Sequence, residues 1–233
     1  MAGTFRYFAP IILNAALIVL IIIFKNKIKA FKHERLYLRA IGAAGIIGLI
    51  VEQVWPAAAG LWQAEISLPV SICTLTELFV IYTLFTGSQK ALDLIYFSMV
   101  GATQAFLTPV FTYGPLPLPF VCYVLKHTIL MVMPIYMVVV HGYLPTQKTV
   151  WKYVAAVMCF AAITVGINAA TGGNYLYLSY KAEAASKTLL SYMGPYPWCF
   201  VTLFFAGLAI CYLYYLPAAF ARRRRRKQEE AII

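Results

Sequence analysis

The sequence predicts an all-α polytopic membrane protein: a seven-transmembrane-helix bundle with its N-terminus outside and its C-terminus in the cytoplasm. The chain of 233 residues is 62% hydrophobic and has a mean hydropathy of +0.78, whereas a soluble domain is closer to half apolar. Seven apolar stretches are long enough to cross a bilayer. The basic residues gather in two clusters beside such stretches, which is a signal of membrane topology.

The apolar stretches define the expected spans. They lie near residues 8–24, 38–56, 67–86, 93–111, 120–140, 150–170 and 197–219. The first stretch lacks a basic leader and a small-residue cleavage site, so we expect a span and not a signal peptide. Pro134 lies inside the fifth span and is expected to kink it. We expect one membrane domain over residues 1–221 and a basic cytoplasmic tail over residues 222–233.

The positive charge sets the expected orientation. One basic cluster follows the first span and the other, Arg222 to Lys227, follows the seventh. An odd number of spans puts both clusters on one side, and the positive-inside rule makes that side cytoplasmic. We expect the tail to bind anionic lipids of the inner leaflet at about 1 kcal/mol per basic residue. No folded nucleic-acid-binding module accompanies the charge, so no nucleic acid partner is expected.

Three polar residues of the predicted spans fall at one depth. Counted from the outer ends of their spans, Cys73 lies about 9 Å deep, and Gln104 and His127 about 10 Å deep. The inner half shows no comparable polar set. Ionisable groups are costly in lipid, so they are candidates for function.

A cysteine and a histidine within hydrogen-bond reach form an activated nucleophile. His127 would take the thiol proton of Cys73, and the thiolate would attack an ester carbonyl to form a thioester. Gln104 or Asn168 would donate to the developing oxyanion. Glu77 or Glu52 would orient the histidine. This chemistry requires neither a metal nor a soluble cofactor.

Further residues are expected to contact the substrate, a membrane phospholipid. They are Glu52, Glu77, Lys126 and Asn168 in the spans, and Asn174, Tyr175 and Trp198 as a cap over the outward opening. Structural interpretations stand beside this one. Buried cysteines often only pack, Lys126 would snorkel to the interface, and the outer aromatic residues would form an interfacial belt.

The five cysteines show no paired spacing, so neither a disulfide framework nor a zinc site is indicated. Cys122 and Cys199 both begin a predicted span at the outer face, which leaves one bridge between them open.

The order of several short motifs resembles one family. The motifs are LPVSIC at 68–73, GATQAFLTP at 101–109, KH at 126–127, VHGY at 140–143, GNYLYL at 173–178 and LSYMGPYPW at 190–198. Together they resemble the YwaF-type integral membrane proteins, bacterial relatives of the transmembrane-protein-164 family. The last two motifs are the most specific.

The resemblance implies a seven-span fold in a bacterial plasma membrane. It also implies a phospholipid acyltransferase with a cysteine acyl-enzyme and a histidine, or a lipid-ester hydrolase. Carried over to this sequence, the pair is Cys73 and His127. Bacterial members commonly have a histidine two residues before the cysteine, where this chain has Ser71. Whether that change abolishes activity is left open by the sequence.

Two other functions remain open. One is a non-catalytic small-molecule or proton-coupled carrier, in which Glu52, Glu77, Lys126 and His127 would form a pathway. The other is a lipid-binding assembly subunit, in which the same residues would only hold helices together. The sequence leaves open the acyl donor, the acceptor, and the choice between transfer and hydrolysis.

Overall fold

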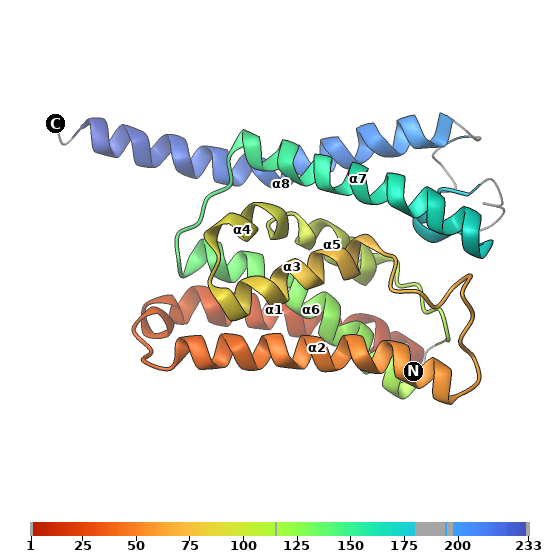
Figure 1. The fold of residues 1–233 in the computed structure, drawn as a ribbon. Helices are drawn as coiled ribbons and strands as arrows, with labels where there is room; N and C mark the ends of the chain where they lie inside the picture. Colours follow the sequence, from red (N-terminus) through yellow and green to blue (C-terminus); the bar gives the residue numbers. More distant parts are fainter. Residues whose placement is uncertain (1, 115, 180–193, 195–197, 232–233) are drawn as a thin grey trace.

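The computed structural model describes residues 2–114, 116–179, 194 and 198–231, and these residues form helices joined by loops (Figure 1). The elements are α1 (Ala2–Lys29), α2 (Glu34–Ala58), α3 (Ile72–Thr86), α4 (Gln89–Ile95), α5 (Ser98–Leu107), α6 (Pro117–Val139), α7 (Gln147–Thr171), the 3-10 turn η1 (Tyr175–Tyr177) and α8 (Trp198–Glu230). No strand occurs in the described residues. The expected all-α class is confirmed.

Among the described residues, five helices are long and apolar enough to cross a membrane: α1 from Phe8, α2, α6, α7 and α8. They match the first, second, fifth, sixth and seventh expected spans. The third and fourth expected spans correspond to shorter apolar helices, Ile72–Thr86 and Ala91–Leu107. The count of seven spans and the orientation of the termini stay predictions.

The third expected span was placed too early, because its helix begins at Ile72 and not at residue 67. Pro69 precedes the helix, and Ser71 caps it by accepting a hydrogen bond from the Thr74 N–H at 3.0 Å. The helix ends at Gly87, which adopts the left-handed conformation at φ 70°. Cys73 therefore lies in the first turn of α3, and its expected depth of about 9 Å of helix is wrong.

The fourth expected span is divided into α4 and α5. Helical hydrogen bonding is interrupted around Tyr96 and Phe97, and α5 begins at Ser98. It ends at Leu107 because Thr108 precedes a proline and takes up a non-helical conformation. Gln104 thus lies only about 5 Å from the end of its helix, not about 10 Å.

The main core forms around α6, which packs against α1, α2, α3 and α5. Its buried residues include Val80 of α3, Ala102 of α5, and Leu130 and Met133 of α6. α6 continues as a helix through the buried Pro134.

The small-residue face of α2 lies in this core. Gly42, Gly45 and Gly48 are buried, and a Cβ on Gly45 would lie 3.2 Å from Ile81 of α3. The glycines let the two helices approach closely.

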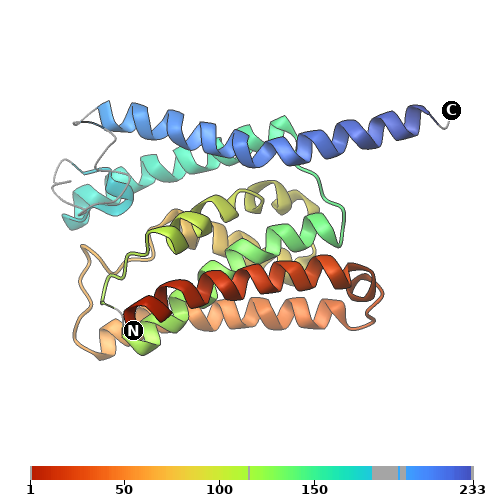
Figure 2. The same cartoon turned by 180° about the vertical axis from the view of Figure 1, so that it is seen from behind.

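α7 and α8 form a second layer beside α4 and α5, apart from α1, α2 and α6 (Figures 1 and 2). Their smaller core includes Phe97, Val150, Tyr153 and Cys211. α8 has 33 residues, about 50 Å, so it extends well beyond a hydrocarbon layer of roughly 30 Å. Its C-terminal end continues through the basic residues without a break.

We expect Gly45→Leu to destabilise the protein by about 1–3 kcal/mol, because extra atoms must displace Ile81 in a packed interface. The thermal midpoint of the detergent-purified protein measures the effect. Gly166→Leu is the matched control, because nothing lies within 4 Å of a Cβ at this position of α7. Equal loss of stability in both variants would contradict the close approach of α2 and α3.

Candidate functional site

Cys73 lies where α3 meets α5. Its Sγ would be 3.4 Å from a Cβ built on Gly101, so the missing side chain of that glycine leaves room beside the thiol. The residue is partly buried. The first turn of a helix carries free N–H groups and the positive end of the helix dipole, which favour negative charge, whereas burial opposes it.

His127 projects from α6 into an aromatic environment and is 6% exposed. Its ring packs against Tyr123 and Phe106, with centroids 4.2 Å and 6.0 Å away. Nδ1 lies 2.8 Å from the Tyr123 carbonyl oxygen. Because a carbonyl only accepts, Nδ1 carries the proton, and the neutral ring keeps its lone pair on Nε2.

Two contacts between α5 and α6 fix their register. The Ser98 hydroxyl donates to the Leu130 carbonyl at 2.8 Å, and the Tyr123 hydroxyl donates to the Ala105 carbonyl at 2.6 Å. The helices therefore run antiparallel, and Gly101 comes to the level of His127. Cys73, beside Gly101, shares that layer, although no hydrogen bond between described residues joins the thiol to the imidazole.

A buried ion cluster lies next to this layer. The Lys126 ammonium of α6 forms an ion pair with Glu52 of α2. The same ammonium is 3.6 Å from Oε2 of Glu77 and 3.4 Å from Oγ1 of Thr74. Glu77 is 1% exposed, and its Oε2 has no hydrogen-bond partner in the described structure.

This cluster corrects two expectations. Lys126 is buried and paired, so it does not snorkel to the interface. The carboxylates of Glu52 and Glu77 lie around Lys126, and the group that orients His127 is the Tyr123 carbonyl.

The model of the TMEM164 family matches residues 1–215 of the chain, which include Cys73, His127 and the buried ion cluster. The chain belongs to the TMEM164 family. Comparisons with curated proteins and with solved structures gave no match. Membership of this membrane family and the long apolar helices together identify an integral membrane protein.

Two expected oxyanion donors of this TMEM164-family chain have other partners. The Gln104 amide donates to the Thr108 hydroxyl at 2.6 Å, at the end of α5. The Asn168 side chain accepts from the Tyr175 N–H at 2.8 Å and donates to the Tyr175 carbonyl at 2.9 Å. The described contacts bring neither amide to Cys73, and their catalytic role stays a prediction.

Tyr175 ties the segment after α7 to the loop before α3. Its hydroxyl donates to the Ala64 carbonyl at 2.7 Å and accepts from the Leu68 N–H at 2.8 Å. The next residues, Leu176 and Tyr177, have φ angles of 55° and 58°, which are uncommon for residues other than glycine. The role of Tyr175 as a cap over the outward opening stays a prediction.

The other two expected cap residues, Asn174 and Trp198, make no described hydrogen bond with the loop before α3. Asn174 accepts from the Ser179 N–H at 3.0 Å within its own loop. Trp198 is 68% exposed at the start of α8. The 190–197 motif lies, apart from Gly194, outside the described residues.

Sequence reasoning missed two polar clusters at the opposite end of the bundle. Asp93 accepts from Tyr143, Thr149 and Lys152 at 2.6, 2.8 and 2.5 Å. Glu34 accepts from Tyr136 and from His141. The expectation that the inner half lacks a polar set is therefore wrong. Asp93 is the only aspartate in the sequence and lies in an apolar stretch. That isolated charge was the feature of the sequence that could have indicated the first cluster.

All five cysteines are free thiols in the structure, so the disulfide that the sequence allowed between Cys122 and Cys199 is not formed. Among the described residues, no group of three histidine, cysteine or acidic side chains is arranged to hold a metal.

We expect Lys126→Met to lower the free energy of unfolding by about 3–5 kcal/mol, because it leaves the buried carboxylate of Glu77 and the partly buried carboxylate of Glu52 without their cation. The thermal midpoint in detergent measures the loss. The control is Lys152→Met, which removes an ion pair whose lysine side chain is 58% exposed. It should cost at most about 1 kcal/mol.

Adding Glu52→Gln to Lys126→Met should restore part of the lost stability, since one uncompensated charge is then removed. A double variant no more stable than Lys126→Met would contradict a charge-pair origin of the effect.

Proposed function

We propose that this chain is a membrane-embedded lipid acyltransferase or lipid-ester hydrolase that forms an acyl thioester on Cys73, with His127 as its base. One observation carries the proposal. The Tyr123 carbonyl holds the Nδ1 proton of His127, which leaves Nε2 as the proton acceptor in the layer of Cys73. The Cys and His pair implied by the family resemblance is the same pair.

In the first step, Nε2 of His127 takes the proton from the Cys73 thiol, and the sulfur attacks the carbonyl carbon of a lipid ester. An S–C bond forms and gives a tetrahedral intermediate. When this collapses, the C–O bond of the ester breaks and the leaving alkoxide takes the proton from the imidazolium. The products are a lipid alcohol and an acyl thioester. Catalytic hydrogen bonds often tighten only when substrate binds, so the separated thiol and imidazole of the free protein are compatible with this step.

In the second step, water or a second lipid alcohol attacks the thioester carbonyl while Nε2 of His127 takes its proton. The C–S bond breaks, and the Cys73 thiolate recovers the proton from the imidazolium. Water gives hydrolysis and an alcohol gives acyl transfer. The aromatic surroundings of His127 suit an apolar acyl chain.

The proposed site opens toward the outer leaflet. Arg35, in the first turn of α2 next to the basic first loop, donates to the carbonyl of Thr86 at the C-terminal end of α3, whereas Cys73 lies at the opposite end. With the basic side in the cytoplasm, Cys73 lies nearer the outer surface. Glycerolipid ester bonds lie at the top of the hydrocarbon layer, which suits this depth.

A proton-coupled carrier is the second candidate, and the buried cluster of Lys126, Glu52 and Glu77 favours it. A carrier would lose function in Glu77→Gln and keep it in Cys73→Ser. The enzyme would lose acyl-adduct formation in Cys73→Ser.

Intact-protein mass spectrometry after incubation with phospholipid tests the thioester. We expect a hydroxylamine-labile adduct of fatty-acyl mass in the wild type and in Cys159→Ser, whose cysteine is exposed on α7, and none in Cys73→Ser. No adduct in the wild type, with Cys73 also unreactive to an alkylating agent, would overturn the enzymatic proposal.

The variant His127→Asn removes the proton-accepting Nε2 and keeps a donor for the Tyr123 carbonyl. The asparagine Nδ2 can still donate to the Tyr123 carbonyl, but the variant has no group in place of Nε2. We expect the adduct to form about 10²–10⁴ times more slowly in a variant that still folds, with a thermal midpoint lowered only by the loss of the ring contacts with Tyr123 and Phe106. His33→Asn, in an exposed loop, is the control. An unchanged rate of adduct formation in His127→Asn would exclude His127 as the base.

A further inference from the structure

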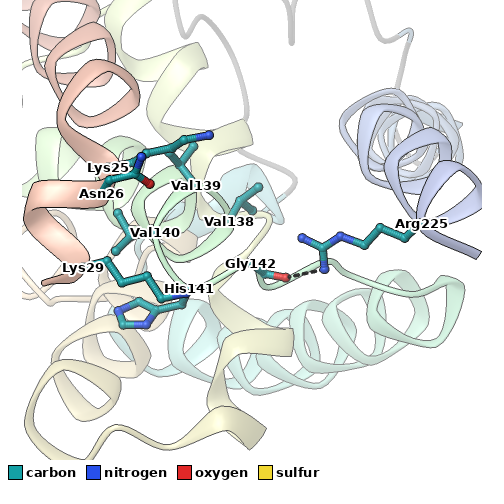
Figure 3. Close-up of a pocket in the computed structure, with 9 residues that line it drawn as sticks. All are labelled: Lys25, Asn26, Lys29, Val138, Val139, Val140, His141, Gly142 and Arg225. Carbon is teal, nitrogen blue, oxygen red and sulfur yellow. Dashed lines mark hydrogen bonds between the residues drawn. The ribbon is translucent and has the colours of Figure 1, made fainter. Parts of the chain in front are cut away.

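A cavity of about 410 Å³ lies at the end of the molecule opposite Cys73. It is an open depression lined by the last turns of α1, the end of α6 with the turn that follows, and the basic part of α8 (Figure 3). Lys25 and Lys29 line it from α1, His141 and Gly142 from the turn, and Arg225 from α8. No carboxylate is among its described lining residues.

The positive charges converge on this space. Lys25 and Lys29 are one turn apart on α1, where like charges repel. Arg225 adds a third charge from the far end of the chain. Its Nη1 donates to the Gly142 carbonyl at 3.4 Å, a long bond that leaves the remaining guanidinium N–H groups for a ligand.

The turn is built to admit that arginine. Gly142 has a φ of +69°, which few other residues tolerate. A Cβ on it would lie 3.3 Å from Nη2 of Arg225. Arg222 makes a second attachment by donating to the Pro145 carbonyl at 3.3 Å. The basic part of α8 is thus held against the turn by two side chains.

The acidic group near the cavity is already occupied. Glu34 accepts hydrogen bonds from Tyr136 and from Nε2 of His141, the latter at 2.9 Å. It holds His141 at the edge of the cavity, and its carboxylate is directed to these two donors.

By helix length, the lining lysines of α1 lie near one end of a membrane-spanning stretch and Arg225 lies beyond the end of another. Twenty residues of helix cover roughly 30 Å of hydrocarbon. Counted from Phe8, that distance ends near Lys27, between the two lining lysines. Counted from Trp198, it ends near Pro217, and Arg225 lies about 12 Å farther on. Lipid phosphates lie in this zone.

We propose that this cavity is a binding site for a phosphate group, contributed by the headgroup of an anionic phospholipid and held by Lys25, Lys29 and Arg225. Arginine matches the geometry of two phosphate oxygens, and the lysines act as point charges. The site is far from Cys73 along the bundle and does not depend on the proposed acyl chemistry.

The alternative is that these basic residues bind no ligand. They would then only set the orientation of the helices in the membrane and stabilise helix C-termini through the helix dipole. The chain offers a matched comparison, because Lys27, Lys32, Arg223 and Arg224 belong to the same two basic clusters but do not line the cavity.

The full chain is reconstituted in phosphatidylcholine nanodiscs with and without phosphatidylglycerol, and retained lipid is measured by native mass spectrometry. Lys25→Gln with Lys29→Gln, and separately Arg225→Gln, should weaken retention of phosphatidylglycerol by about fivefold for each charge removed. Lys27→Gln with Lys32→Gln, and Arg223→Gln, should weaken retention less than the lining variants that remove the same number of charges.

Inorganic phosphate is the second arm of the experiment. If it raises the thermal midpoint of the wild type but not of Arg225→Gln, the cavity binds the phosphate group itself, whether free or lipid-borne. If inorganic phosphate leaves the thermal midpoint unchanged, but the lining variants still retain less phosphatidylglycerol than the controls, the cavity takes its phosphate group from a lipid. Equal losses in lining and control variants, or no loss in either, would overturn the proposal.

Discussion

The end of the bundle that carries Cys73 depends on α3 being shorter than the hydrocarbon layer of a membrane. Its 15 residues cover about 22 Å, less than the roughly 30 Å of a hydrocarbon layer. Backbone groups before such a helix need partners within the protein, because lipid provides none. Ser71 caps the helix, and the Tyr175 hydroxyl accepts from the Leu68 N–H. The same shortness puts Cys73 in a first helical turn.

Two consecutive residues of α6 divide the polar groups between two sides of that helix. Neighbouring positions on a helix differ by about 100° in direction. Lys126 therefore points to α2 and α3, where it meets both glutamates, and His127 contacts Phe106 of α5. This separation explains why neither Glu52 nor Glu77 supports the imidazole and why a backbone carbonyl does so.

The α7–α8 layer is joined to the rest by a small number of polar contacts between large side chains. Tyr96 donates to the Tyr214 carbonyl at 3.0 Å, and the Tyr214 hydroxyl donates to Thr103 at 2.7 Å. Asp93 receives bonds from Thr149 and Lys152 of α7. The contacts of Tyr96 and Tyr214 are partly buried among apolar side chains, where little water competes, so they favour one relative position of the two layers.

The sequence by itself determined the helical class, the membrane environment and the five long helices, because long apolar stretches have few other stable states. It also indicated Cys73 and His127, because polar residues stand out in such stretches. The true ends of α3 and α5 required local detail, since proline and a capping serine shortened them. Only the tertiary structure decided which side chains contact one another. Lys126 pairs with Glu52, and the Tyr123 carbonyl orients His127. Arg225, near the end of the chain, donates a hydrogen bond to the Gly142 carbonyl. Partners distant in sequence are set by the rotation and register of packed helices, which hydropathy does not encode.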